Sequence, residues 1–196
     1  MFLRKYSTCF PSTRGIIIAL VTEGLWGQDL PIPPRGIYHL VPPPSWKEQN
    51  HQTPKDLPPS ISLERVGALR GSLELTVIWH PKNDPAFTRP DNIRALVIAG
   101  QSAIRANAVE KEFPLQPIQG TAGQGFYYVA TDRTYKLPAS GIPVPGEYPV
   151  LTHGELGLGT VVVSFTIFSD GKDDVAVKEA LAAIRGATFS GLGKQR

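Results

Sequence analysis

Alternating polar and apolar positions mark the strands of one domain. Residues 72–79 alternate between the two kinds of side chain, which is the two-residue period of a strand with one buried face. Residues 61–66 are a shorter run of the same kind, so we expect the two to pair as a hairpin that turns between Gly67 and Gly71. Turn residues separate four further predicted strands: 113–118, 126–134, 147–158 and 160–169. The last is apolar on both faces, which indicates a central strand covered on both sides.

Two helices are predicted where apolar residues recur every three or four positions. The first spans residues 91–112, with Asp91 as its N-terminal cap. The second begins at Asp173 and Asp174 and ends at Gly186, a residue suited to a left-handed C-terminal position. The resulting order is β-β-α-β-β-β-β-α. We therefore expect an α+β fold, an antiparallel β-sheet with helices packed on it.

The pattern divides the chain into four parts: a leader (1–27), a Pro-rich extended arm (28–60), the α+β sandwich domain (61–187) and a flexible tail (188–196). Nine of the 19 prolines lie within residues 31–59. Their fixed φ angle and missing N–H group exclude a long helix or a central strand from this segment. Interleaved apolar residues indicate that the arm packs on the domain, with Trp46 as an anchor.

The leader has the layout of an export signal. Three basic residues and no acid lie within residues 1–14, and a short apolar run follows at 15–21. This favours a periplasmic or secreted protein. Two alternatives stay open: an organelle presequence, or an ordinary N-terminal strand or helix of a protein that remains cytoplasmic, as a subunit of a larger assembly.

The net charge of +3 and the sequence pI near 9.0 come from the same N-terminal residues. Residues 61–187 carry 12 basic and 13 acidic side chains, so a phosphate-binding surface is not predicted and we expect no nucleic-acid partner. No apolar run reaches 18 residues, which excludes an ordinary transmembrane helix. Cys9 is the single cysteine, so an internal disulfide and a multi-cysteine zinc site are excluded.

Common catalytic and metal-binding motifs are missing. The sequence has neither G-x-S-x-G nor H-E-x-x-H, and its four histidines lack the spacing of a helical or strand metal site. Two glycine clusters, 120–125 and 154–159, lack the spacing of phosphate-binding loops and are interpreted as hairpin turns. We expect no cofactor and no metal, and a protein without catalytic activity is favoured.

Aromatic and charged residues on the predicted strands are the candidates for ligand or partner binding, because aromatic side chains are enriched at interfaces. Asp132, at the far end of an aromatic strand face, could bind a ligand amine or act as a base. The alternative is that Asp132 caps the turn after its strand and that Arg133 pairs with a neighbouring carboxylate. The candidate binding residues are Trp79, His80, Tyr128, Asp132, Arg133 and His153.

Residues 61–187 resemble the PsbP-like α/β/α sandwich family. The resemblance rests on the run 125–132, an aromatic strand ending in Thr-Asp, on Gly146-Glu147-Tyr148, and on residues 164–167 before a helix rich in Ala and Leu. It is greatest toward the small exported bacterial members. The resemblance implies an accessory, chaperone-like or partner-binding role, and it implies no shared catalytic residues.

We therefore expect a non-catalytic, exported accessory or binding domain that engages a partner protein or a small ligand. The alternative is a small hydrolase or transferase with a dispersed acid and histidine site. The fold would have to assemble that site from separate parts of the chain: His80, Asp132, Glu147 and His153.

Overall fold

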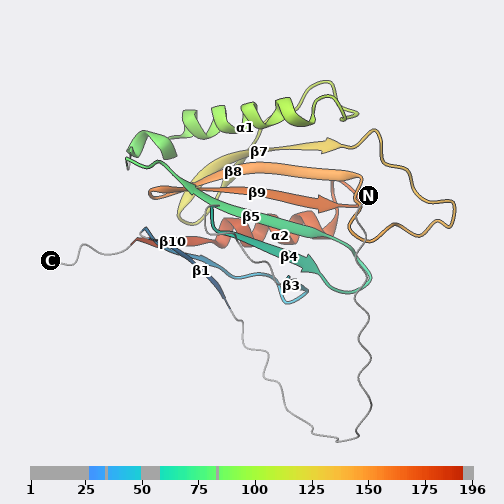
Figure 1. The fold of residues 1–196 in the computed structure, drawn as a ribbon, viewed down its shortest axis with the longest axis horizontal. Coiled ribbons are helices and arrows are strands. Elements are labelled where there is room, and N and C mark those ends of the chain that lie inside the picture. The colour runs from blue at the N-terminus through green and yellow to red at the C-terminus, as the bar shows by residue number, and fades with distance from the viewer. Residues whose placement is uncertain (1–26, 34, 50–57, 83, 192–196) are drawn as a thin grey trace, which may run out of the picture.

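A seven-stranded antiparallel sheet is the centre of the fold in the computed structural model, which describes residues 27–33, 35–49, 58–82 and 84–191 (Figure 1). The order across the sheet is β3 (Trp46–Glu48), β4 (Ser60–Arg65), β5 (Ser72–Trp79), β9 (Val161–Ser169), β8 (Val150–Leu158), β7 (Gly123–Thr131) and β6 (Gln116–Gln119). The predicted leader lies outside the described residues except for Gly27.

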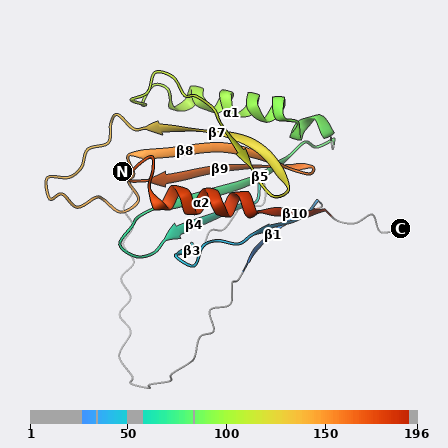
Figure 2. The ribbon, with the colours of Figure 1, turned by 180° about the vertical axis from the view of Figure 1, so that it is seen from behind.

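Helices cover both faces of this sheet. Helix α1 (Pro90–Ile104) follows a 3₁₀ turn (Pro85–Thr88) and packs on β7 and β8, whereas α2 (Val175–Gly186) lies across the opposite face (Figures 1 and 2). From β4 to α2 the order of strands and α-helices is β-β-α-β-β-β-β-α, and β10 follows. The predicted α+β class, an antiparallel sheet with helices packed on it, is confirmed.

The two faces of the sheet differ in composition because side chains alternate along each strand. On the α2 face, Leu75 pairs with Phe165 of β9, and both are fully buried in the main core. On the α1 face, the same two strands carry Glu74 and Thr166 opposite each other. A smaller apolar cluster lies under α1, comprising Val97, Ala108, Phe113, Tyr128 and Ala130.

The described residues of the predicted extended arm form three strands before β4. β1 (Gln28–Ile32) and β2 (Gly36–Leu40) make a small antiparallel sheet with β10 (Thr188–Gly191), in the order β1-β2-β10, and β3 joins the large sheet. Pro31 lies on β1, an edge strand, where a missing N–H group is tolerated. Residues 188–191, predicted as the beginning of a flexible tail, are instead ordered as β10 because β2 offers them a strand to pair with.

Trp46 anchors this N-terminal segment to α2. Its indole is 4% exposed, and its Nε1 donates to Glu179 Oε2 at 2.9 Å. Arg65 Nε donates to the same oxygen at 2.9 Å, and Ser45 Oγ donates at 3.1 Å. The carboxylate of Glu179 therefore ties α2 to β3 and β4, and these contacts lower its pKa, chiefly through the bond from Arg65.

Helix boundaries differ from those predicted. α1 ends at Ile104 rather than at residue 112, because the following residues bond to the end of β7: Ala108 bridges Asp132, and Val109 N donates to Thr131 O at 2.8 Å. Asp91 lies in the first turn of α1 rather than at the cap, which is Arg89. Gly186 lies in the last turn of α2 and does not adopt the left-handed conformation.

Several of the clustered glycines serve the packing of β7 against β8 rather than turns. A Cβ atom at Gly154 would lie 2.5 Å from the Phe126 carbonyl oxygen, from Phe165 Cζ and from Tyr127 Cβ. Only the end of that cluster forms a turn, at Gly159, where φ is +59°. The interpretation of 154–159 as a hairpin turn was therefore wrong for its first residues, because Gly154 and Gly157 lie within β8.

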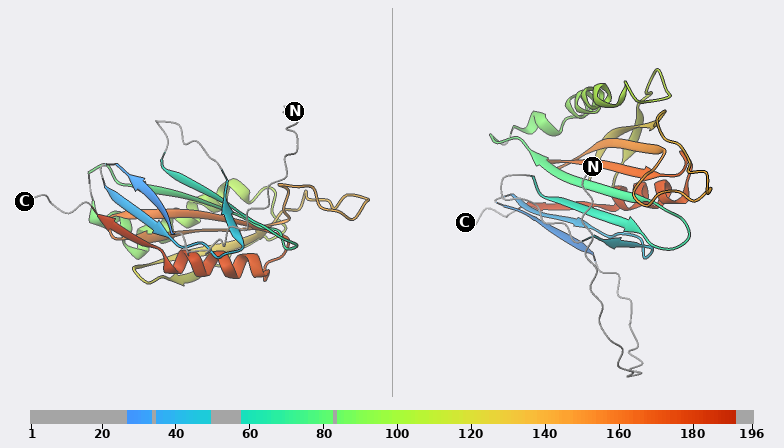
Figure 3. Two further views of the ribbon diagram at one scale, coloured as in Figure 1. Left: turned by 90° about the horizontal axis from the view of Figure 1, so that it is seen from below. Right: turned by 45° about the vertical axis from the view of Figure 1, so that its right-hand side comes forward.

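The two edge strands of the large sheet are short or contain proline, and one loop projects from the sheet. β6, at one edge, contains Pro117, and β3, at the other, has three residues. The loop between β7 and β8 projects beyond the end of the sheet (Figure 3). It carries exposed apolar side chains: Leu137 (55% exposed), Ile142 (71%) and Val144 (40%).

Candidate functional site

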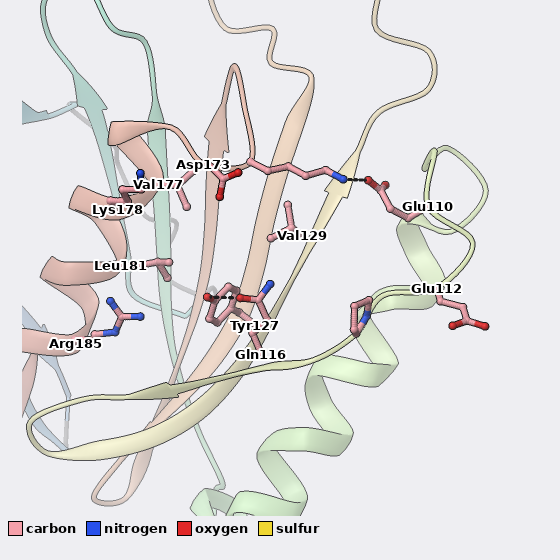
Figure 4. A pocket seen from close by; sticks show the side chains of 12 residues that line it. Glu110, Glu112, Gln116, Tyr127, Val129, Asp173, Val177, Lys178, Leu181 and Arg185 are labelled. Atoms are coloured by element: carbon pink, nitrogen blue, oxygen red, sulfur yellow. Dashed lines mark hydrogen bonds and ion pairs between the residues drawn. The ribbon is translucent and has the colours of Figure 1, made fainter.

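A cleft of about 480 Å³ lies on the α2 face, bordered by α2, by the β9–α2 loop and by β6 and β7 (Figure 4). Cavities of this volume hold small ligands in many proteins. Apolar side chains form its floor: Val177 and Leu181 of α2, which are 4% and 6% exposed, and Val129 of β7. Tyr127 adds its ring, and its hydroxyl donates to Gln116 Oε1 at 2.7 Å.

An ion pair closes one end of the cleft. Lys172 Nζ, in the β9–α2 loop, lies 2.6 Å from Glu110 Oε1, as the dashed line in Figure 4 shows. The Glu110 carboxylate also accepts from Thr131 Oγ1 at 2.8 Å and from Thr131 N at 2.7 Å. Burial alone would raise the pKa of Glu110, but Lys172 and Thr131 outweigh it and lower that pKa to about 2. Lys172 is thus already neutralised by a protein group.

Two further cations border the cleft along α2. Lys178 and Arg185 are exposed, and within the ranges that the structure describes neither forms an ion pair. They are seven residues apart on one helix, a separation of about 10 Å along its axis. Glu112 lies on the opposite wall. Asp173, in the β9–α2 loop, is a second exposed acid in the lining. The cleft therefore combines an apolar floor with two available positive charges along α2, and its acids lie at the loop end and on the opposite wall.

A second polar cluster lies under α1 on the other face of the sheet. His153 and Glu155 are neighbours on the same side of β8, with His153 Nε2 3.9 Å from Glu155 Oε1. The hydroxyl of Thr166 is hydrogen-bonded to His153 Nδ1 at 3.0 Å, and the Tyr128 ring lies 5.6 Å from the imidazole. Glu155 is only 7% exposed, and its Oε2 has no partner among the described residues.

Burial shifts the protonation equilibria of this cluster. It raises the pKa of Glu155 to about 7, although a hydrogen bond with Ser164 opposes the shift. It lowers the pKa of His153, against a hydrogen bond with the Phe165 backbone, and it raises the pKa of Tyr128 to about 12. Near neutral pH the imidazole is therefore uncharged and the carboxyl group is partly protonated.

The six residues predicted for binding do not form one site. Tyr128 and His153 are cross-strand partners under α1. Trp79 and His80 lie at one end of the sheet beside Arg35, whose Nη2 donates to the His80 carbonyl oxygen at 3.3 Å. Asp132 and Arg133 follow β7 at the other end. Through the strand register, Trp79 is level with Gly123 of β7, nine residues before Asp132, a separation of about 30 Å along the strands.

Asp132 and Arg133 have local roles. Thr134 N and Thr134 Oγ1 both donate to Asp132 Oδ1 at 2.7 Å, so this carboxylate caps the turn after β7, and these bonds lower its pKa. Arg133 donates to the Ala106 carbonyl oxygen rather than to a carboxylate. Asp132 therefore caps the turn after its strand, as the alternative interpretation of the sequence predicted. Arg133 was expected to pair with a carboxylate, and it binds a backbone carbonyl group instead.

The alternative catalytic set is dispersed. His80 and Asp132 lie at opposite ends of the sheet, Glu147 belongs to the projecting loop, and His153 lies under α1. The acid beside His153 is Glu155, a polar strand residue that was noted in the sequence but was not among the six predicted binding residues or the alternative catalytic set. The sequence feature that could have indicated this pair is the two-residue spacing of His153 and Glu155 in a predicted strand, which places both on the same face.

The cleft residues were also missed by sequence reasoning. A three- and four-residue spacing on one helix relates Lys178, Leu181 and Arg185. This spacing could have predicted a charged border beside an apolar stripe. Glu110 and Lys172 are 62 positions apart, and only the fold brings them together.

Metal ligands do not gather in the described part of the chain: no group of three or more His, Cys, Asp or Glu side chains is placed to hold an ion. No helix within these same residues is long and apolar enough to cross a membrane.

Comparisons with known proteins identify no family. No protein-family model matches the chain, and no curated protein matches it. Among solved structures, a crystal structure from Bacteroides thetaiotaomicron VPI-5482 is similar, with a TM-score of 0.49 and 13% sequence identity. The match covers 81% of this chain and 47% of that one, so this chain corresponds to about half of that protein's length.

Proposed function

We propose that this protein is a non-catalytic binding domain that holds a small ligand in the cleft beside α2. The observation that carries the proposal is the pairing of two unneutralised cations, Lys178 and Arg185, with the apolar floor formed by Val177 and Leu181. A ligand that satisfies both features has an apolar body and an anionic group. Glu112, on the opposite wall, disfavours a second anionic group on that side.

The cleft supports a small molecule more than a large protein surface. Its volume of about 480 Å³ is in the range of small-ligand sites, and its floor and border are built by regular elements rather than by loops alone. Straight-chain carboxylates are suitable probes because their apolar length can be varied at constant charge. Each two methylene groups buried should tighten the Kd by about tenfold.

The experiment is a titration of the ¹⁵N-labelled protein with octanoate and decanoate, followed by NMR. We expect shift changes centred on Val177, Leu181 and Tyr127, tighter binding of decanoate, and weak binding of decanol. The double variant K178E/R185E should lose binding at least tenfold, and the matched variant K82E/K136E, which changes the same charge at exposed sites outside the cleft, should retain it. Shift changes elsewhere, or equal binding by both variants, would reject the cleft as an anion site.

An accessory role toward a partner protein has its own support in the β7–β8 loop. Leu137, Ile142 and Val144 are exposed together on this projecting segment, and exposed apolar groups of this kind mark contact surfaces. A photo-crosslinking residue at position 142 should capture a specific partner in the native host, whereas one at the exposed Lys82 should not. Identical products from both positions would argue against this role.

A catalytic function is the less favoured alternative. Thr166, His153 and Glu155 follow one another in the order of a nucleophile, a base and an acid. However, Thr166 lies within β9, whose backbone pairs with β5 on one side and β8 on the other. The neighbouring N–H groups are therefore committed to the sheet and not available to stabilise an oxyanion. Release of p-nitrophenol from p-nitrophenyl acetate that depends on Thr166 would favour the alternative.

We also propose that the protein is exported and that it is related to the PsbP-like family. The acid-free basic segment and apolar run of residues 1–21 support export, and the antiparallel sheet between two helices supports the kinship. Mass spectrometry of the N-terminus from the native host tests export. A mature chain that begins near residue 25 is expected, and a chain that retains residues 1–14 would contradict it.

A further inference from the structure

A buried acid and a partly buried imidazole lie together under α1, on the sheet face opposite the cleft. His153 Nε2 and Glu155 Oε1 are 3.9 Å apart, and Glu155 Oε2 has no partner in the part of the chain that the structure describes. The Thr166 hydroxyl fixes the imidazole from its other nitrogen at 3.0 Å. A buried carboxyl group with an unbonded oxygen is costly when ionised, because no hydrogen bond replaces the lost water.

Helix α1 covers this pair. A Cβ atom at Gly100 would lie 3.3 Å from His153 Nε2 and 3.9 Å from the Tyr128 hydroxyl, so the helix backbone passes directly over the imidazole. One turn earlier, Val97 is fully buried against the small apolar cluster that holds α1 on the sheet. That cluster is separate from the main core, so α1 can loosen while the rest of the sheet stays folded.

We infer that His153 and Glu155 form one proton-binding site whose occupancy determines how firmly α1 is held on the sheet. With the proton bound, the pair is neutral overall, and α1 covers no net charge. When the proton leaves, a carboxylate remains beneath the helix. Its ionised form must then be stabilised by solvent, and solvent reaches this nearly buried carboxylate far better when α1 moves away.

The charged and titratable neighbours do not compensate that carboxylate. On α1, Arg94 is exposed to solvent, and its Cζ lies 5.8 Å from the ring centroid of Phe126. Phe126 is the cross-strand partner of Glu155. From β7, Tyr128 faces the pair. From β5, Glu74 lies opposite Thr166 and adds a like charge. The remaining groups, the hydroxyls of Ser164 and Thr166 on β9 and the exposed Arg89 and Asp91 at the beginning of α1, give no buried cation.

The direction of the pH effect follows from the geometry and the pKa. Burial raises the pKa of Glu155 above the ordinary carboxyl value of 4.5, to about 7. A carboxyl group whose pKa is higher in the folded than in the unfolded state stabilises the fold. This stabilisation is full when the pH is below the unfolded-state pKa, and it is lost as the pH rises through the folded-state pKa. Attachment of α1 should therefore be strongest near pH 4.5 and should weaken as the pH rises through about 7.

Amide hydrogen exchange of the full chain, followed by NMR at pH 5 and pH 8 and corrected for intrinsic rates, tests this inference. The opening constants of α1 amides such as Val97 and Gln101 should rise at least about tenfold between the two values, while those of Phe165 in β9 change little. E155Q, which imitates the protonated acid, should remove the pH dependence. E147Q, at an exposed carboxylate of the projecting loop, should leave it intact.

An equal pH response in E155Q and in the wild-type protein would overturn the inference. A second measurement covers the case in which E155Q does not fold: the carboxyl carbon of Glu155 and the ring protons of His153 are titrated by NMR in the wild-type chain. A Glu155 midpoint near 4.5, with no linked change at His153, would overturn the inference in the same way.

Discussion

Lys172 Nζ lies 2.6 Å from Glu110 Oε1 and thereby connects the two helical layers of the protein. Glu110 follows α1, on one face of the sheet, and Lys172 precedes α2, on the other. Because Thr131, at the end of β7, also donates twice to Glu110, three separate segments meet at one carboxylate. The pair also forms one end of the cleft.

Replacing Glu110 should destabilise the fold more than replacing its neighbour. E110Q loses the ion pair and weakens the bonds from Thr131, and we expect a loss of about 2 kcal/mol in the free energy of unfolding. E112Q changes an exposed carboxylate with no recorded ion pair among the described residues, and we expect a change within about 0.5 kcal/mol. Urea unfolding at pH 7 measures both, and equal losses would contradict the role of Glu110.

The same carboxylate should make the protein sensitive to acid. The folded pKa of Glu110 is about 2, below its ordinary value of 4.5. A carboxyl group whose pKa is lower in the folded than in the unfolded state stabilises the fold at pH values above the unfolded-state pKa. This stabilisation is lost as the pH falls through the folded-state pKa. The stability difference between the wild-type protein and E110Q should therefore be constant above pH 5 and shrink between pH 4.5 and pH 2. Urea unfolding across this range checks the trend, and a difference that grows toward low pH would refute it.

Trp46 should contribute to stability through its indole N–H as well as through burial. W46F keeps an aromatic ring in the core but removes the donor to Glu179, and we expect a loss of about 1.5 kcal/mol from that bond together with the cost of the smaller ring. A double-mutant cycle with E179Q separates the two effects. An interaction energy near zero in unfolding experiments would show that the indole bond is unimportant.

Two glycines should respond oppositely to alanine. G154A places a Cβ atom 2.5 Å from Phe126 O, and we expect a loss of about 2–3 kcal/mol because the facing backbone must move. At Gly186, in the last turn of α2, a Cβ atom would meet nothing within 4 Å, and G186A should gain about 0.5 kcal/mol from helix propensity. Thermal unfolding compares them, and a similar Tm for both variants would contradict this account.

The main sheet was predictable where one residue period dominated. The alternation around Leu75 and the apolar run around Val162 gave β5 and β9, since strand side chains alternate and a central strand is covered twice. The small sheet was not predictable, because proline obscured the alternation in β1 and because β10, the second strand that pairs with β2, lies at the far end of the chain. Proline excludes a central strand but permits an edge strand, and that distinction depends on neighbours remote in sequence.

The sites were less predictable than the fold because they depend on cross-strand neighbours. Tyr128 and His153 were selected individually, and the register of β7 and β8 shows them as partners. The same register places Glu155 under α1, where burial and not sequence spacing gives it its unusual pKa. The charged border of the cleft follows from helix spacing, but the wall that faces it comes from β6 and from the segment around Glu112.

The short β3 and the proline in β6 bear on how other chains can associate with this one. Exposed sheet edges are templates for strand addition, which underlies both peptide capture and aggregation. Pro117 offers no N–H group at one edge, and the other edge provides only the three residues Trp46–Glu48 for a new ladder. Extension of the large sheet by a foreign strand is therefore disfavoured at both ends. At the large sheet, recognition is therefore left to side chains, in the cleft or on the projecting loop, and its edges are poor templates for stacking into cross-β assemblies.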